Sequence, residues 1–313
     1  MPPTVETRSL PFDVAAVNPS TGLVGPSRLL VADVGGTHAR LAWACQDARG
    51  RLLLQGYQQF DCAAHSGLGA ILRAFVHGDS SSVPQDGPPL RAVVAIAGVV
   101  QGDVLRNSNL AWPVALEATR IEAGLAALEL LNDFEATAWA VEALDDAAGL
   151  LLCGPADAPA EGPALILGPG TGLGAALYIP ASARAPAHVL ASEAGHASLA
   201  AATPREIVLL QELQRDRPMV NYEALLSGPG LCASYRALCV IDGVVPRWES
   251  AGQISAAAAT GDAQAAEVLH LFCAMLGSFA GDLAMTFRAR RVYLAGGIPA
   301  RIAPLLQHSD FAR

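Results

Sequence analysis

Two segments of this chain share one design, in which an apolar strand runs into a turn of glycine and threonine and a second strand follows. The first is DVGGTHAR at residues 33–40, and the second is GPGTGLG at residues 168–174. A pattern that recurs in both halves of a chain predicts two structurally similar halves. Glycine lets backbone approach a ligand closely, and consecutive N–H groups can hold phosphate oxygens. The pair therefore indicates a fold that binds a polyphosphate with two turns.

Length and composition set the class of protein. With 313 residues, 52% of them hydrophobic, the chain has enough apolar side chains for two cores. A net charge of -9 argues against nucleic acid as a partner. The six cysteines are scattered, so we expect reduced, mostly buried thiols rather than disulfides or a zinc site. No basic, apolar leader and no membrane-length apolar run is visible, so we expect a cytoplasmic protein with no membrane contact.

The order of the predicted elements indicates an α/β fold. After a loose leader at residues 1–27, three strands should form an antiparallel meander, and strands and helices then alternate. We expect domains at residues 28–142 and 143–313. The predicted strands are 29–33, 39–45, 51–60, 91–97, 128–131, 164–167, 175–179 and 291–294. The predicted helices are 67–77, 116–127, 134–144, 205–214, 228–237 and 263–288.

The first glycine turn begins with an acidic residue at a strand end. Asp33 is well placed to hold the water shell of a magnesium ion, which needs only one or two carboxylates. Gly35, Gly36 and Thr37 offer backbone N–H groups and a hydroxyl, and Gly170, Thr171 and Gly172 repeat the pattern in the second turn. A simple hairpin turn would explain either motif alone, and the pairing favours phosphate binding.

A second acidic position lies in LLNDFEA, where an apolar strand ends on Asn132 and Asp133 and a helix begins. Aspartate is a favoured helix N-cap, which is one interpretation of Asp133. Ligands, however, bind at strand ends in α/β sheets, and a carboxylate there can accept a hydroxyl proton during phosphoryl transfer. The sequence alone is consistent with both interpretations.

Two further segments carry polar or small residues of interest. Glu193 and His196 in SEAGH, together with Glu223 in YEALLSGPG, offer acceptors for adjacent sugar hydroxyls, although each alone is also typical of a surface. Gly296 and Gly297 follow the last predicted strand and leave room for a flat adenine or ribose ring, or simply form a strand-to-helix turn.

Seven blocks occur in the order found in bacterial glucokinases, which this chain resembles from about residue 29 to its end. They are DVGGTHAR, SNLAW, LLNDFEA, GPGTGLG, SEAGH, EALLSGPGL and AGGIPAR. The resemblance implies two ribonuclease H-like domains of the kind found in hexokinase and actin, with a cleft between them. It implies an enzyme that uses ATP and Mg²⁺ to phosphorylate glucose, and a homodimer.

The resemblance also implies roles for single residues. It makes Asp133 the base for the sugar 6-hydroxyl and places Trp112 near the sugar, and it makes Asp33 the magnesium residue. The implied sugar ligands are Asn109, Asn132, Asp133, Glu193, His196 and Glu223. The implied nucleotide ligands are Asp33, Gly35, Gly36, Thr37, Gly170, Thr171, Gly172, Gly296 and Gly297.

This sequence departs from the family pattern in two places. Ala194 stands where the family has a second glycine before the histidine, and its methyl group is expected to narrow a backbone approach. The resemblance also implies another strand and a long helix after Arg313, which the sequence does not contain.

Three alternatives stay open from the sequence. A related repressor and kinase family shares the phosphate turns, but it usually carries a cysteine cluster after the histidine and a DNA-binding segment, and neither pattern is visible here. A sugar sensor with no useful turnover would keep the pocket residues. A kinase for another hexose or an amino sugar would share every motif.

Overall fold

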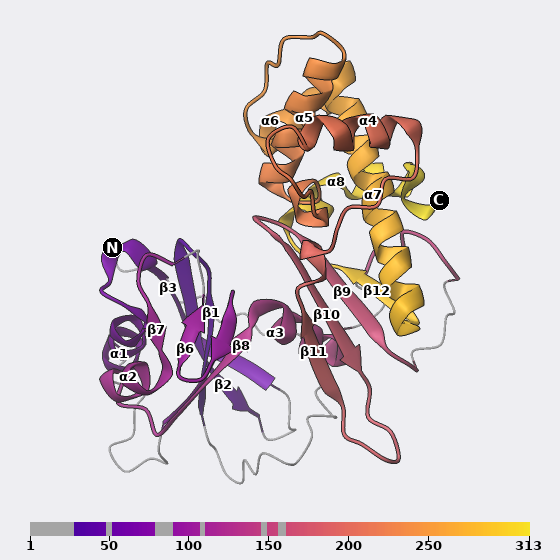
Figure 1. Ribbon diagram of the computed structural model, residues 1–313. Coiled ribbons are helices and arrows are strands. Elements are labelled where there is room, and N and C mark those ends of the chain that lie inside the picture. Colours follow the sequence, from indigo (N-terminus) through magenta and orange to yellow (C-terminus); the bar gives the residue numbers. More distant parts are fainter. Residues whose placement is uncertain (1–27, 48–51, 79–89, 107–109, 145–148, 156–160) are drawn as a thin grey trace. The chain divides into compact units, whose positions relative to one another are not determined.

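The structure is a computed structural model that describes residues 28–47, 52–78, 90–106, 110–144, 149–155 and 161–313. The expected leader at residues 1–27 and the expected sugar ligand Asn109 lie outside the described residues. The chain divides into two compact units, Met1–Ala148 and Gly149–Arg313, each with a hydrophobic core of its own (Figure 1). The domain boundary that we placed between residues 142 and 143 stays a prediction.

The first unit is built on a five-stranded sheet in the order β3-β2-β1-β4-β8. Strand β2 is antiparallel to β1 and β3, whereas β1, β4 and β8 are parallel to one another. The sheet strands are β1 (Leu29–Val34), β2 (His38–Gln46), β3 (Leu52–Asp61), β4 (Arg91–Ile96) and β8 (Ala127–Asn132). A small second sheet holds β5 (Val99–Gln101), β6 (Val104–Arg106) and β7 (Val114–Ala115), and the helices are α1 (Leu68–Gly78), α2 (Leu116–Glu122) and α3 (Asp133–Trp139).

Alternating burial along the strands builds the core of this unit. In β1 every second residue is buried, beginning with Leu30. The apolar residues of α1 recur at helical spacing and pack on the sheet, where the rings of Phe75 and Trp43 lie 5.3 Å apart. Helix α1 thus covers part of this sheet, whose carboxyl edge carries Asp33 and Asp133.

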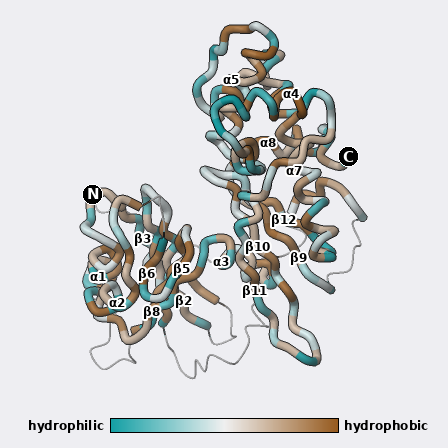
Figure 2. Tube along the Cα trace, in the orientation of Figure 1, coloured by the Kyte–Doolittle hydropathy of each residue, from teal (hydrophilic) through white to brown (hydrophobic). Residues whose placement is uncertain are grey.

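The second unit is built on a four-stranded sheet in the order β11-β10-β9-β12. All six residues of β9 are buried, and this strand begins as a brown, apolar segment in Figure 2. The strands are β9 (Ala164–Pro169), β10 (Leu173–Ile179), β11 (His188–Ser192) and β12 (Arg291–Leu294). The helices are α4 (Pro204–Leu213), α5 (Gly228–Ile241), α6 (Ala251–Ala259), α7 (Ala263–Phe287) and α8 (Gly297–Gln307).

Helix α7 is the central helix of the second unit. By length and composition alone this 25-residue helix could cross a membrane, and it is the one such helix among the described residues. Half of its most apolar window is buried inside the protein, and residues such as Phe272, Leu276 and Phe279 lie in the core. Its apolar character is therefore explained by packing against α5, α6 and the sheet.

The two sheets repeat one topology. The order β3-β2-β1-β4 in the first unit corresponds to β11-β10-β9-β12 in the second, with two antiparallel pairs followed by one parallel pair in each. The first Gly-Thr turn (residues 35–37) joins β1 to β2, and the second Gly-Thr turn (residues 170–172) joins β9 to β10, in each case the first two strands of the unit. The two similar halves predicted from the recurring turn are thus present in the fold.

Several elements differ from the sequence prediction. The helix expected at residues 116–127 ends at Glu122, since Gly124 adopts a positive φ of 67° that a continuing helix does not allow. The helix expected at residues 134–144 is α3 followed by the 3-10 helix Ala140–Ala143. The short strands β5, β6, β7 and β11 and the helices α6 and α8 were not predicted.

Candidate active site

The first Gly-Thr turn connects β1 to β2 and is closed by the backbone. The N–H of Gly35 donates to the carbonyl oxygen of His38 at 2.9 Å. Asp33, near the end of β1, accepts a hydrogen bond from Arg40 Nη1 at 2.8 Å, and its side chain is 57% exposed. A carboxylate so exposed has room to hold the water shell of a cation, although Arg40 already offsets part of its charge.

Asn132, and not Asp133, caps helix α3. Its Oδ1 accepts hydrogen bonds from the N–H groups of Phe134 at 2.9 Å and Glu135 at 3.3 Å. Its Nδ2 donates to the carbonyl oxygen of Gly98 at 3.3 Å. The N-cap interpretation of Asp133 is therefore wrong, because Asp133 is the first helical residue. The amide that precedes it fixes the start of the helix and with it the position of the Asp133 carboxylate.

Asp133 has an unusual environment for a carboxylate. Burial raises its pKa above the ordinary aspartate value, and the negative charge of Asp33 adds to the rise. A hydrogen bond from the N–H of Phe134 to Oδ1, at 3.0 Å, acts in the opposite direction. A half-buried carboxylate whose pKa is raised holds a proton more readily than an exposed one, as a general base requires.

Three glycine segments meet in the second unit. The N–H of Gly170 donates to the carbonyl oxygen of Gly172 at 2.8 Å. The N–H of Gly228, at the start of α5, donates to the carbonyl oxygen of Gly170 at the same distance. Gly296 has a φ of 93°, and a Cβ there would lie 3.1 Å from the carbonyl oxygen of Pro169. The second Gly-Thr turn, the start of α5 and the turn before α8 therefore lie against one another. Thr171 at the tip is exposed.

The acidic residues and the histidine predicted around the sugar are brought together. His196 Nδ1 lies 3.6 Å from Glu193 Oε2, and His196 Nε2 lies 3.5 Å from Glu223 Oε1. The other Glu223 oxygen accepts a hydrogen bond from the N–H of Leu173 at 2.8 Å. All three side chains keep exposed surface, from 35% for Glu223 to 63% for Glu193. They form a cluster of hydrogen-bonding groups beside the second Gly-Thr turn.

Two glycines lie close to neighbouring atoms around this cluster. A Cβ on Gly172 would lie 2.6 Å from Glu223 Oε2, and a Cβ on Gly195 would overlap the carbonyl oxygen of Leu173. Ala194, by contrast, is half-buried and packs against the hydrophobic core of the unit. Its methyl group therefore packs on the core, and the expectation that it narrows a backbone approach stays a prediction.

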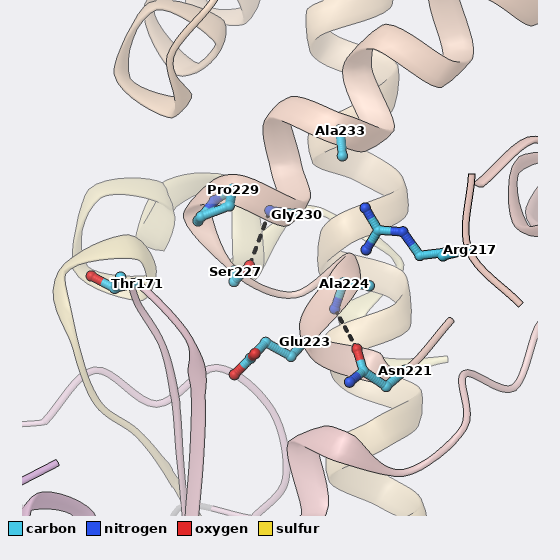
Figure 3. A pocket seen from close by; sticks show the side chains of 9 residues that line it. All are labelled: Thr171, Arg217, Asn221, Glu223, Ala224, Ser227, Pro229, Gly230 and Ala233. Carbon is cyan, nitrogen blue, oxygen red and sulfur yellow. Dashed lines mark hydrogen bonds between the residues drawn. The ribbon is translucent and has the colours of Figure 1, made fainter. Parts of the chain in front are cut away.

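A cavity of about 290 Å³ opens beside Thr171 (Figure 3). One side is the start of α5, where the Ser227 hydroxyl accepts a hydrogen bond from the N–H of Gly230 at 3.0 Å. Arg217 projects toward the cavity from the segment after α4, as Figure 3 shows. The lining residues are Thr171, Arg217, Asn221, Glu223, Ala224, Ser227, Pro229, Gly230 and Ala233.

Sequence reasoning missed most of this lining. The motif EALLSGPGL contains Ser227, Pro229 and Gly230, and a serine followed by proline and glycine is a helix-start signal that points to this helix N-terminus. Arg217 and Asn221 lie outside the quoted motifs, and their place beside Thr171 follows only from the fold.

No group of three or more His, Cys, Asp or Glu residues within the described ranges could hold a metal ion by itself. Magnesium does not need such a group, because it keeps most of its waters. Asp33 and Asp133 are close enough for the charge of one to raise the pKa of the other. The site therefore fits a hydrated divalent cation.

Comparison with known proteins decides the family. The sequence profile of the family described as Glucokinase matches residues 30–313. The chain belongs to the glucokinase family. It is 40% identical over 299 residues to a glucokinase-like protein of Xylella fastidiosa, covering 94% of this chain and 86% of the relative. It is 37% identical over 303 residues to a glucokinase of Chromobacterium violaceum, covering 94% of this chain and 82% of that one.

Solved structures of glucokinases share the fold. The crystal structure of glucokinase from an Antarctic psychrotroph has a TM-score of 0.78 and 33% identity, covering 91% of this chain and 87% of that one. The α/β fold and the resemblance to bacterial glucokinases stated from the motifs are thereby confirmed, and the chain is a sugar kinase by family.

Proposed function

We propose that this glucokinase-family chain transfers the γ-phosphoryl group of ATP to the 6-hydroxyl of glucose, with Asp133 as the general base. The observation that carries the proposal is the environment of Asp133. It follows a parallel strand of an α/β sheet, its helix start is held by Asn132, and burial together with the charge of Asp33 raises its pKa. Family membership supports the reaction class.

The proposed step balances as an in-line transfer. The sugar hydroxyl gives its proton to the carboxylate of Asp133 while its oxygen forms a bond to the γ-phosphorus, and the bond from that phosphorus to the bridging oxygen of ADP breaks. Phosphoryl transfer is accelerated mainly by positioning the reactants and by stabilising charge in the transition state. A fixed carboxylate would position the hydroxyl, and fixed N–H donors would stabilise the charge on the phosphate oxygens.

We assign the phosphates of ATP to the two Gly-Thr turns. Gly35, Gly36 and Thr37 serve in one turn, and Gly170, Thr171 and Gly172 in the other. We assign the adenosine part to the turn of Gly296 and Gly297, where the space beside Gly297 is open, since a Cβ on Gly297 would meet nothing within 4 Å. When bound, Mg²⁺ would neutralise phosphate charge, and Asp33 is the residue that would hold it through water.

We assign the sugar hydroxyls to the cluster of Glu193, His196 and Glu223. This cluster offers both carboxylate acceptors and a ring nitrogen. Asn132 also belongs to the proposed site, with one amide hydrogen used by Gly98 and the other left for a hydroxyl. Asn109 stays a proposed ligand from the resemblance alone.

The experiment is a coupled assay for sugar 6-phosphate with a panel of hexoses and amino sugars, each offered with Mg-ATP, Mg-ADP or polyphosphate. The proposal expects glucose with Mg-ATP to give the highest kcat/KM. A higher kcat/KM for another sugar would contradict glucose as the preferred substrate and identify the protein as a kinase for that sugar. Sugar binding by calorimetry without turnover would contradict the kinase proposal and favour a sensor. The expected homodimer and cytoplasmic location stay predictions, and analytical ultracentrifugation tests the first.

A further inference from the structure

One residue outside the motifs touches both ends of the first Gly-Thr turn. Strand β3 runs directly into the 3-10 helix Cys62–Ala64. The N–H of Cys62 donates to the carbonyl oxygen of Thr37 at 2.9 Å, and its Sγ lies 3.4 Å from the carbonyl oxygen of Gly35 as a thiol donor. Cys62 therefore contacts the carbonyl groups on either side of Gly36.

The Cys62 thiol is buried and protonated, so it can donate a hydrogen bond. Cys62 is 3% exposed and belongs to the hydrophobic core of the first unit. Burial raises the pKa of this thiol, and the charge of Asp61 adds to the rise. A neutral, buried S–H is a poor nucleophile but keeps its proton as a donor. The side chain therefore acts by filling space under the turn and by donating to Gly35.

The carbonyl group of Cys62 makes a third contact. It accepts a hydrogen bond from the indole Nε1 of Trp112 at 3.3 Å. Trp112 is half-buried against the same core and is the last residue of the SNLAW block. The N–H, the thiol and the carbonyl group of Cys62 are thus all in use, on two separate segments of the unit.

We propose that Cys62 is a positioning residue for ATP binding, which holds the Gly35–Thr37 turn in its phosphate-binding shape and is itself held by Trp112. The inference rests on the proposed function in one respect, namely that this turn binds phosphate. Nothing in the sequence motifs assigns Cys62 or Trp112 this role, because a lone cysteine after a strand carries no signal of what it touches.

Cys62→Ala and Cys45→Ala form a matched pair of variants. Cys45 is half-buried on β2 of the same sheet, and its Sγ lies 3.7 Å from the carbonyl oxygen of Leu53 on β3. Cys45→Ala therefore removes the same kind of thiol contact, but at a place away from the turn. For Cys62→Ala we expect the KM for Mg-ATP to rise about two- to fivefold, the usual effect of one weak hydrogen bond. The KM for the sugar should stay the same, and Cys45→Ala should change neither.

Two more variants separate positioning from simple packing. Cys62→Ser keeps a donor at the position and should restore part of the Mg-ATP affinity. Trp112→Phe keeps an aromatic ring but removes the indole donor, and it should raise the KM for Mg-ATP in the same direction as Cys62→Ala. A rise in the sugar KM alone for Trp112→Phe would contradict the proposed link.

Amide hydrogen exchange tests the inference without relying on catalysis. The N–H groups of Gly35 and Cys62 should exchange faster in Cys62→Ala than in wild type, and at the wild-type rate in Cys45→Ala. If wild type phosphorylates no sugar, exchange at the turn together with Mg-ATP calorimetry still decides the matter. Equal exchange and equal nucleotide affinity in both alanine variants would overturn the proposal. If Cys62→Ala does not fold, Cys62→Ser against wild type takes its place.

Discussion

Glu223 accepts a hydrogen bond from the backbone N–H of Leu173 at 2.8 Å, and Leu173 is the first residue after the second Gly-Thr turn. The same carboxylate lies 3.5 Å from His196 through its other oxygen. A side chain assigned to the sugar is thus tied to a turn assigned to the phosphates. A change in the turn should therefore reach the sugar ligands.

Gly172→Ala should weaken sugar binding. Its Cβ would lie 2.6 Å from Glu223 Oε2, so this oxygen must shift away from the N–H of Leu173, and the carboxylate moves with it. We expect the KM for the sugar to rise about tenfold, in line with the usual energy of steric overlap. Gly170→Ala is the control, because a Cβ there meets nothing within 4 Å. Equal sugar KM values for the two variants would contradict the assignment of Glu223.

Asn132→Ala should lower both stability and turnover. The change removes the side-chain acceptor for two N–H groups of α3, and loss of an N-cap typically costs about 1 kcal/mol of unfolding free energy. It also frees the start of the helix that carries Asp133. Asn132→Ser retains a capping oxygen and should recover most of the stability in urea unfolding. Full kcat in Asn132→Ala would show that the cap does not position the base.

Asp133→Asn should unfold at a higher temperature than wild type near pH 7. The folded-state pKa of Asp133 is raised by burial, so folding favours its protonated form, and the charged form costs stability at any pH above that pKa. As the pH falls from the raised folded-state pKa to the ordinary pKa of the unfolded chain, wild type recovers this stability and the difference should shrink toward zero. Melting curves of both proteins between pH 4 and 7 measure it, and a less stable variant at pH 7 would contradict the raised pKa.

Asp33→Asn should move the acid side of the pH profile to lower pH. The base must be unprotonated, so kcat falls as the pH drops through the pKa of Asp133, which the charge of Asp33 helps to raise. The same variant should require more Mg²⁺ for half-maximal rate if Asp33 holds the ion through water. An unchanged acid limb would show that the two carboxylates do not interact in solution.

Much of the strand framework could be predicted from the sequence because apolar runs and turn residues mark it directly. The strand at residues 291–294 was predicted with the bounds that the structure gives β12, and the meander of β1, β2 and β3 was predicted as antiparallel. The recurring Gly-Thr turn also predicted two similar halves, and the repeated strand order agrees with that prediction.

The missed elements lacked such marks. Strands β5, β6 and β7 have only two or three residues each, too few to show alternation. Helix α6 consists mostly of alanine and other small residues, so no apolar face stands out, and α8 contains Pro304, which normally argues against a helix. The secondary structure of these segments therefore depends on packing against residues that are distant in the sequence.

The candidate site divides in the same way. Residues in motifs, such as Asp133 and Glu223, could be named from the sequence because acidic residues at strand ends and next to glycine turns are recognisable. The capping role of Asn132, the place of Arg217 beside Thr171 and the contacts of Cys62 depend on distances between distant segments. Those relationships follow only from the folded chain.

The most direct test of the account is the rate of glucose 6-phosphate formation with Mg-ATP in wild type, Asp133→Asn and Glu135→Gln. Glu135 is the matched control, because it lies on the same helix and burial also raises its pKa. We expect kcat to fall at least about a hundredfold in Asp133→Asn and to stay near wild type in Glu135→Gln. Wild-type turnover in Asp133→Asn would contradict the assignment of Asp133 as the base.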